Sequence, residues 1–176
     1  MDATRYGRIW ELSIRGARSP ETRELGRPVY DETFGEVRVR RWERQAPVVT
    51  WDLRAKARLL EVDFTPRLCA PVTIGRSPGI LDAGTVRLGR HLSVYAGLSD
   101  FRSRKENRSY ANLRVFVDDR DVTWATIGNE SGWLHLPPAT VTPGDHRLVF
   151  EAKVDPDRGA KNPGHLSLCV MAESYE

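Results

Sequence analysis

Apolar and polar positions alternate over short runs of this chain, most clearly from Val86 to Val154. Leu113, Val115 and Val117 recur at every second position, and polar turns separate one run from the next. A period of two sends side chains alternately to the two faces of a strand, so the pattern predicts half-buried strands in antiparallel sheets. The strands expected in this half of the chain cover residues 86–97, 112–118, 121–127, 133–136, 146–154 and 165–173.

The first half of the chain has a less uniform pattern. It predicts strands at residues 8–15, 29–30 and 36–43. Residues 48–64 alternate as one long strand or two bent strands, but residues 53–61 also have helical propensity, so helix and strand both stay open there. Prolines at positions 66, 71 and 78 predict a loop-rich region over residues 65–84. The order of the strands within residues 1–85 is left open.

The alternation also predicts the core and the fold class. Nine to eleven strands fit an all-β fold, a two-sheet antiparallel β-sandwich closed as a jelly roll, better than an immunoglobulin-like sandwich with its Cys–Trp–Cys pattern. At 176 residues, we expect a single domain over residues 1–176. The predicted inward side chains are Ile14, Val37, Val39, Leu59, Val94, Val115, Val117, Leu148, Phe150, Leu168 and Val170.

The composition of the chain narrows the classes of ligand and partner that we expect for it. The net charge is only +3, and acidic residues are interspersed with the 27 basic ones, so a nucleic-acid ligand is not expected. No apolar run approaches the roughly 18 residues of a membrane span, so a membrane partner is not expected either. The first residues contain no apolar segment typical of a signal peptide, which predicts a cytoplasmic protein, or a secreted one if a signal was trimmed.

The sequence has few candidates for catalytic or metal chemistry. Cys69 and Cys169 lie outside any CxxC or Cys/His spacing, so we predict no metal site and no cofactor. Whether the two cysteines pair is left open. The P-loop, HExxH and GxGxxG motifs do not occur, and we predict no catalytic residue.

Four segments carry a family resemblance. They are YAGLSD at 95–100, LRVFVDDRDV at 113–122, GWLHL at 132–136 and PGDHRLVFEA at 143–152. Residues 86–173 thereby resemble galactose-binding-like jelly-roll modules, including carbohydrate-binding modules appended to glycoside hydrolases. The chain departs from the family at residues 118–121, where Asp-Asp-Arg-Asp replaces the usual Asp-Gly hairpin turn. The structural calcium of many members is not carried over, because the chain has no dense run of Asp and Asn ligands.

Sugar recognition combines an aromatic platform with planar polar side chains, and the loops at one end of a jelly roll can supply both. We therefore predict a non-catalytic binding module for carbohydrate or a glycan-like ligand. Two alternatives stay open: a structural or interaction β-sandwich that docks onto a partner protein or assembly, and a small β-sandwich enzyme acting on a sugar. The predicted ligand-binding residues are Arg102, Arg104, Asn107, Tyr110, Trp133 and His135.

Overall fold

The computed structural model describes residues 6–23, 25–99, 110–158 and 165–176. Contacts within the chain cluster into two compact units, residues 1–48 and residues 49–176, and each is described by itself. The expectation of a single domain over residues 1–176 stays a prediction, because compactness does not establish whether two units unfold cooperatively.

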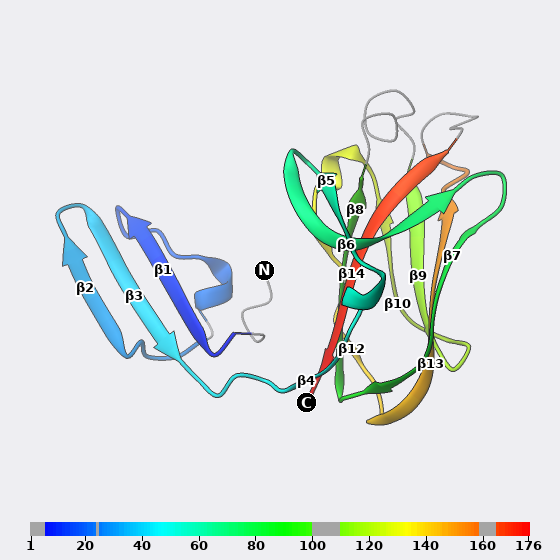
Figure 1. The fold of residues 1–176 in the computed structure, drawn as a ribbon. Coiled ribbons are helices and arrows are strands. Elements are labelled where there is room, and N and C mark those ends of the chain that lie inside the picture. The colour runs from blue at the N-terminus through cyan, green and yellow to red at the C-terminus, as the bar shows by residue number, and fades with distance from the viewer. Residues whose placement is uncertain (1–5, 24, 100–109, 159–164) are drawn as a thin grey trace. The chain divides into compact units, whose positions relative to one another are not determined.

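The first unit is a three-stranded antiparallel sheet in the order β1-β3-β2 (Figure 1). Its strands are β1 (Arg8–Ile14), β2 (Tyr30–Phe34) and β3 (Val37–Glu43), and a short 3-10 turn, η2 (Pro20–Thr22), lies in the β1–β2 connection. The strands predicted at residues 8–15 and 36–43 are confirmed.

This sheet buries its polar face and exposes its apolar one. Glu11 and Ser13 of β1 are buried, whereas Leu12 and Ile14 are 71% and 56% exposed. The inward orientation predicted for Ile14 is therefore wrong, and so is that of Val37 and Val39, which pair with Ile14 and Leu12 and lie half-buried on the same side of the sheet. The polar face is covered because Glu11 forms an ion pair with the buried Arg40 of β3.

The connection between β1 and β2 completes that cover. Thr22 of η2 donates a hydrogen bond to the Glu11 carboxylate, and so does the backbone N–H of Ser19 at 3.0 Å. The Trp42 indole is 3% exposed and donates its Nε1–H to the Gly26 carbonyl at 3.1 Å. The connection satisfies polar groups that an apolar layer would leave unpaired.

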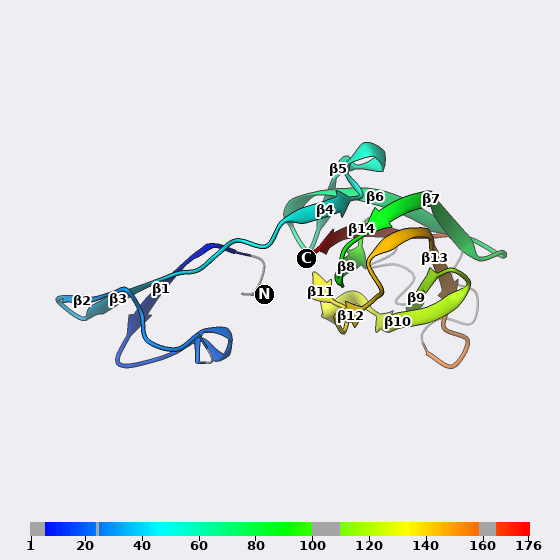
Figure 2. The same ribbon diagram turned by 90° about the horizontal axis from the view of Figure 1, so that it is seen from below.

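The second unit is a sandwich of two antiparallel sheets (Figures 1 and 2). One sheet, here the β9–β13 sheet, has the order β10-β9-β13-β7. The other, the β8–β14 sheet, has the order β11-β8-β14-β6-β5, with β12 beside β8 and β4 beside β14. Their strands are β4 (Val49–Asp52), β5 (Arg58–Val62), β6 (Thr65–Ile74), β7 (Gly79–Leu88), β8 (His91–Leu98), β9 (Ala111–Val117), β10 (Arg120–Ile127), β11 (Leu134–His135), β12 (Ala139–Thr140), β13 (Gly144–Val154) and β14 (Leu166–Tyr175).

The chain crosses repeatedly between these two sheets, as a jelly roll does. It passes from β6 to β7, back to β8, across to β9 and β10, back to β11 and β12, and ends through β13 and β14. The predicted all-β, two-sheet antiparallel jelly roll is confirmed. The only helical segments among the described residues are three 3-10 turns, and none of them could cross a membrane. One of these turns, η3 (Arg54–Lys56), followed by β5, settles the ambiguity at residues 53–61.

The core lies between the two sheets. Seven of the predicted inward residues are buried in it: Val94, Val115, Val117, Leu148, Phe150, Leu168 and Val170. Leu59 is instead 72% exposed, so its predicted orientation is wrong. Its neighbours Leu60 and Val62 face inward, and a shift of one residue in a strand reverses every side chain.

The loop-rich region predicted for residues 65–84 is wrong, because these residues form most of two ten-residue strands. Pro66 pairs only with β5 and Pro71 only with β14, because β6 exchanges one partner for the other between residues 69 and 70. Each proline therefore has one open side, where its missing N–H costs no ladder hydrogen bond.

A disulfide joins Cys69 of β6 to Cys169 of β14, with 5.4 Å between the Cα atoms. The pairing that the sequence left open is thus present. The bond lies where the two strands separate, since Ala70 opposite Val170 is their last pair.

Candidate functional site

The candidate site lies on the outer face of the β8–β14 sheet. Leu92 and Val94 of β8 point into the core, so His91, Ser93 and Tyr95 belong to the other face. On β14 the same face carries Met171 and Glu173, which lie opposite Tyr95 and Ser93. Polar, aromatic and sulfur-containing groups therefore share a surface that the core does not use.

Three rings form a stack on this face. Tyr95 lies between Trp133 and His135, with ring centroids 6.1 Å and 4.3 Å apart and interplanar angles of 8° and 14°. The Nε2 of His135 is 2.9 Å from the Ser93 hydroxyl. We call the three rings of Trp133, Tyr95 and His135, together with the Ser93 hydroxyl that contacts His135, the ring stack. Its members fix one another's orientation. Tyr95 and Ser93 are buried, so a ligand meets the half-buried Trp133 and His135, which are already ordered.

A glycine lets the loop carrying Trp133 approach β8. A Cβ at Gly97 would lie 2.5 Å from the Gly132 carbonyl oxygen and 2.5 Å from a Val62 methyl group. Only glycine leaves room for this close backbone contact, which holds the Trp133 loop and the β5–β6 hairpin against the sheet.

Arg67 extends the ring stack at the Trp133 end. Its guanidinium carbon lies 5.3 Å from the indole centroid, a cation–π distance. The Nε of Arg67 is buried, and no hydrogen-bond acceptor reaches it among the described residues.

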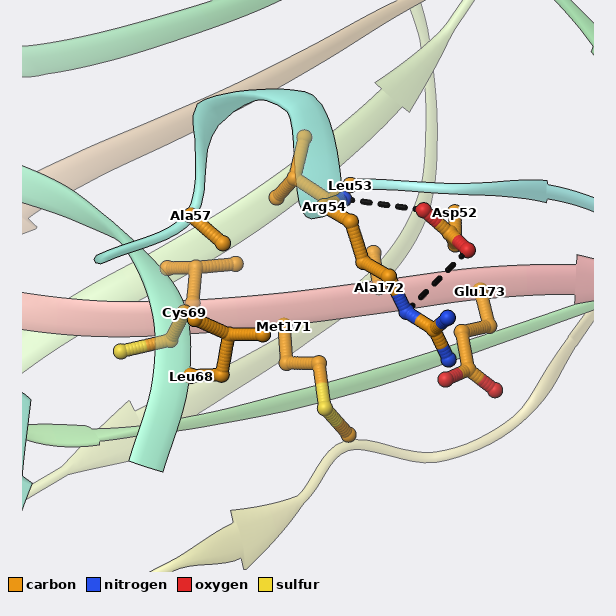
Figure 3. A pocket seen from close by; sticks show the side chains of 10 residues that line it. Asp52, Leu53, Arg54, Ala57, Leu68, Cys69, Met171, Ala172 and Glu173 are labelled. Atoms are coloured by element: carbon orange, nitrogen blue, oxygen red, sulfur yellow. Dashed lines mark hydrogen bonds and ion pairs between the residues drawn. The ribbon is translucent and has the colours of Figure 1, made fainter. Parts of the chain in front are cut away.

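A pocket of about 300 Å³ opens next to the ring stack, where β6 separates from β14 (Figure 3). Its walls are mainly apolar and include Leu53, Leu68 and Met171 together with Cys69 of the disulfide. Met171 and Trp133 both pack against the apolar cluster that contains Cys69, so the pocket and the stack share these neighbours. This volume is at the lower end of the range for small-molecule sites.

Charged side chains line the end of the pocket nearest β4. Asp52 and Glu173 are cross-strand partners, and both line it together with Arg54. The Asp52 carboxylate accepts the Arg54 backbone N–H at 3.0 Å and forms an ion pair with the Arg54 Nε at 3.4 Å (Figure 3). A ligand in the pocket would find acceptors and a donor at this end and apolar contacts elsewhere.

The predicted site residues fall into three places. Trp133 and His135 lie in the ring stack, where Tyr95 brings them together. Tyr110 contacts the Gly128 turn and packs 5.8 Å from the Arg158 guanidinium carbon, and its hydrogen bond with Glu130 raises the pKa of its hydroxyl. Arg102, Arg104 and Asn107 lie outside the described residues, so the site assignment stays a prediction.

Tyr95 and Arg67 are not among the site residues predicted from the sequence, for different reasons. Tyr95 lies in the predicted strand 86–97, and its position next to the inward Val94 places it on the face opposite the core. Arg67 lies in the segment that its flanking prolines led us to expect as loop. No described group of three His, Cys, Asp or Glu side chains could hold a metal ion.

No protein-family model matches the chain, and no curated protein matches it either. Solved structures similar to it are carbohydrate-binding modules and proteins that contain them. A Clostridium perfringens ZmpB structure, comprising the second CBM51 module in complex with GlcNAc and INT domains, is 13% identical with a TM-score of 0.43; the match covers 68% of this chain and 25% of that one. The present chain thus spans about a quarter of that structure's length.

Two further structures have similar scores. The C-terminal CBM6 module of LamC, a marine laminarinase from Zobellia galactanivorans, is 6% identical, with a TM-score of 0.35 and coverage of 72% of this chain and 92% of that one. The ZmpB M60 catalytic domain with two CBM51 modules is 10% identical, with a TM-score of 0.45 and coverage of 100% and 19%. With TM-scores below 0.5, the functional conclusions below rest on this chain's own residues.

Proposed function

We propose that this protein is a non-catalytic carbohydrate-binding module whose ligand lies across the ring stack and enters the adjoining pocket. The observation that carries the proposal is the Arg67–Trp133–Tyr95–His135 array beside the apolar pocket. Sugars present apolar C–H patches and paired hydroxyl groups, and an aromatic surface flanked by planar polar groups matches both.

Each part of the site has a role in this proposal. The half-buried Trp133 indole and Met171 supply apolar contact surface. The Arg67 guanidinium donates to ligand hydroxyl oxygens, and the His135 imidazole, oriented by Ser93, exchanges hydrogen bonds with them. The pocket holds the end of the sugar or one of its substituents.

Glycan-array binding with purified protein tests the proposal, followed by dissociation constants for the best ligand. We expect Trp133→Ala and Arg67→Leu each to weaken binding at least about tenfold, in line with the roughly 1–2 kcal/mol of an aromatic or cation–π contact. Phe64→Ala is the matched control, because Phe64 is a 75% exposed aromatic residue on the same β5–β6 hairpin. An array with no bound glycan contradicts the proposal.

Release of reducing ends by the parent protein would indicate the enzyme alternative instead. Asp52 and Glu173 are then the pair to test, because glycoside hydrolysis uses two carboxyl groups that face one cleft. Asp52→Asn and Glu173→Gln would abolish turnover if the protein were a hydrolase, and we expect no turnover to begin with.

A second candidate function, docking onto a partner protein, is favoured by the exposed side of the β1-β3-β2 sheet. Trp10, Leu12, Ile14 and Phe34 lie on that side and are at least half exposed. Apolar patches of this kind mark interaction surfaces. If the sugar-binding proposal holds, Leu12→Lys leaves glycan affinity unchanged. Docking is favoured instead if the parent binds no glycan but assembles in light scattering, and if Leu12→Lys abolishes that assembly.

A further inference from the structure

The opposite sheet of the sandwich carries an exposed tryptophan. Thr123 and Ile127 of β10 are buried, and Trp124 between them points away from the core with 57% of its surface exposed. Across the strands of the β9–β13 sheet, Trp124 lies opposite Arg114, which lies opposite Glu151. An indole this open on the outer face of the sheet leaves ring surface available for stacking.

Hydrogen-bonding side chains flank that indole on the same face. Arg114 is its cross-strand neighbour, with a side chain 57% exposed. Two pairs further along, on the same face, the Thr126 hydroxyl donates to the Asn112 Oδ1 at 2.6 Å, which fixes the amide so that its Nδ2 is presented as a donor. An aromatic ring beside a guanidinium and an oriented amide of the neighbouring strand is suited to a polyhydroxylated ligand.

The charges on this face cancel. Arg114 pairs with Asp121 at 3.7 Å, Lys153 with Glu151 at 2.6 Å, and Arg147 with Asp82 at 3.0 Å. Among the described side chains of this face, these three positive and three negative groups compensate one another and give little attraction for a nucleic acid or an acidic polymer. The same paired groups still offer donors and acceptors to hydroxyl groups, so the electrostatics favour an uncharged ligand.

We propose that the face around Trp124, Arg114 and Asn112 is a second glycan-binding surface, selective for neutral polysaccharides. This inference rests on the proposed function. The two sheets share one core, so their outer faces point away from each other, and a single molecule engages two polymer chains at once. The protein therefore cross-links neutral polysaccharides, and its affinity for a polymer exceeds that of either face alone.

The test uses the full chain with three neutral polysaccharides, galactomannan, arabinoxylan and mixed-linkage β-glucan, and with polygalacturonate as the acidic probe. Affinity gel electrophoresis gives a dissociation constant for each polymer, and light scattering reports cross-linking. The variants are Trp124→Ala, Trp133→Ala and, as matched control, Trp10→Ala, which removes another half-exposed indole at 50%. Melting curves check that each variant is folded.

We expect the parent to bind a neutral polymer and to raise its scattering. Trp124→Ala and Trp133→Ala should each bind about tenfold or more weakly and should cross-link no longer, while Trp10→Ala should match the parent. The second surface is contradicted, with the proposed function left standing, if Trp133→Ala loses binding but Trp124→Ala does not. It is also contradicted if only polygalacturonate is bound, or if Trp10→Ala loses as much as Trp124→Ala. If the parent binds none of the four polymers, the second surface is contradicted, and the glycan array decides the proposed function separately.

Discussion

At the scale of single residues, the first unit depends on a charge pair that takes the place of an apolar core. Burial raises the pKa of the Glu11 carboxyl, but hydrogen bonds from Thr22 and Arg40 outweigh burial and hold that pKa below its ordinary value. Glu11 therefore stabilises the fold as a carboxylate. This contribution is present above the unfolded pKa of about 4.3 and is lost as the pH falls through the lower folded pKa.

Removing one partner of that pair should lower the unfolding free energy by more than the small buried surface of the side chain suggests. Glu11→Ala removes the closest partner of the buried Arg40 guanidinium and leaves it the Asp31 carboxylate, 3.6 Å from its Nε, so we expect a loss of about 3 kcal/mol in the unfolding free energy of the first unit. Glu32→Ala, at an exposed position of the neighbouring strand β2, should change it by less than about 0.5 kcal/mol. Hydrogen exchange of residues 8–43 measures both, and equal protection in the two variants would show that the pair contributes nothing.

A second titratable pair links His146 of β13 to Asp118 in the β9–β10 turn. His146 Nδ1 lies 2.6 Å from Asp118 Oδ2, and its Nε2 lies 2.8 Å from the Thr142 carbonyl oxygen. The hydrogen bond to Asp118 raises the pKa of the imidazole and lowers that of the carboxyl. With an acceptor at each ring nitrogen, the doubly protonated imidazolium is the stabilised form.

This pair predicts a definite pH dependence. Because the folded pKa of His146 is raised, its contribution is complete below the unfolded value of about 6.5 and is lost as the pH rises through the folded value. The parent's melting temperature should thus fall more between pH 6 and pH 8 than that of His146→Gln. Parallel curves for the two proteins over that range would refute the assignment.

At the scale of elements, the position of the disulfide matters more than its presence. It joins β6 and β14 at their last shared pair, next to the pocket and beneath Trp133. The half-cystines are 100 residues apart in sequence, so the bond removes much freedom from the unfolded chain. It also bears on localisation, because oxidising compartments preserve such bonds; the cytoplasmic location expected from the sequence stays a prediction.

The oxidised state is directly measurable. The intact mass should be lower by two hydrogens than that of the reduced chain, and neither cysteine should react with a thiol reagent before reduction. The double variant Cys69→Ser, Cys169→Ser should lose about 2–5 kcal/mol of stability. A stoichiometric thiol reaction of the native, unreduced protein would contradict the pairing.

The packing of β13 offers a simpler test of the sandwich. Phe150 is fully buried between the sheets, and Phe150→Ala should cost about 3–5 kcal/mol in denaturant unfolding. Phe64→Ala removes the same side chain from a 75% exposed position and should cost less than about 0.5 kcal/mol. A midpoint unchanged by Phe150→Ala would mean that the register of β13 is reversed.

How far the sequence could be read depended on whether local pattern or distant partners decide the outcome. The alternation around Val94, Val115 and Phe150 was enough to predict strand, face and core. At Ile14 the same alternation predicted the wrong face, because the burial of Glu11 depends on Arg40, 29 residues away. Similarly, β6 can form a strand because each of its prolines has a paired strand on one side only. The positions of the prolines in the sequence do not reveal this arrangement.

The candidate site shows the same division. Trp133 and His135 were identifiable by residue type. The alternation of inward and outward side chains along β8 places Tyr95 on the outer face. The stack itself could not be predicted, because β11 pairs with β8 over about forty residues of sequence and Gly97 must admit the loop. The pocket arises from the separation of β6 and β14, which involves residues a hundred positions apart.

At the scale of the whole molecule, the chain combines a small sheet with a bare apolar side and a jelly roll whose two outer faces have different chemistry. One jelly-roll face offers an ordered ring stack beside a pocket, and the other offers an open indole among balanced charges. A binding module explains both faces without requiring any catalytic group.

The most direct test of this account is a hydrogen-exchange footprint of the best-bound glycan on the full chain. We predict slower exchange in residues 65–69, 91–98 and 131–136, which carry Arg67, Tyr95, Trp133 and His135, with the effect lost in Trp133→Ala. Binding that leaves these three segments unchanged while protecting residues 8–43 would contradict the account.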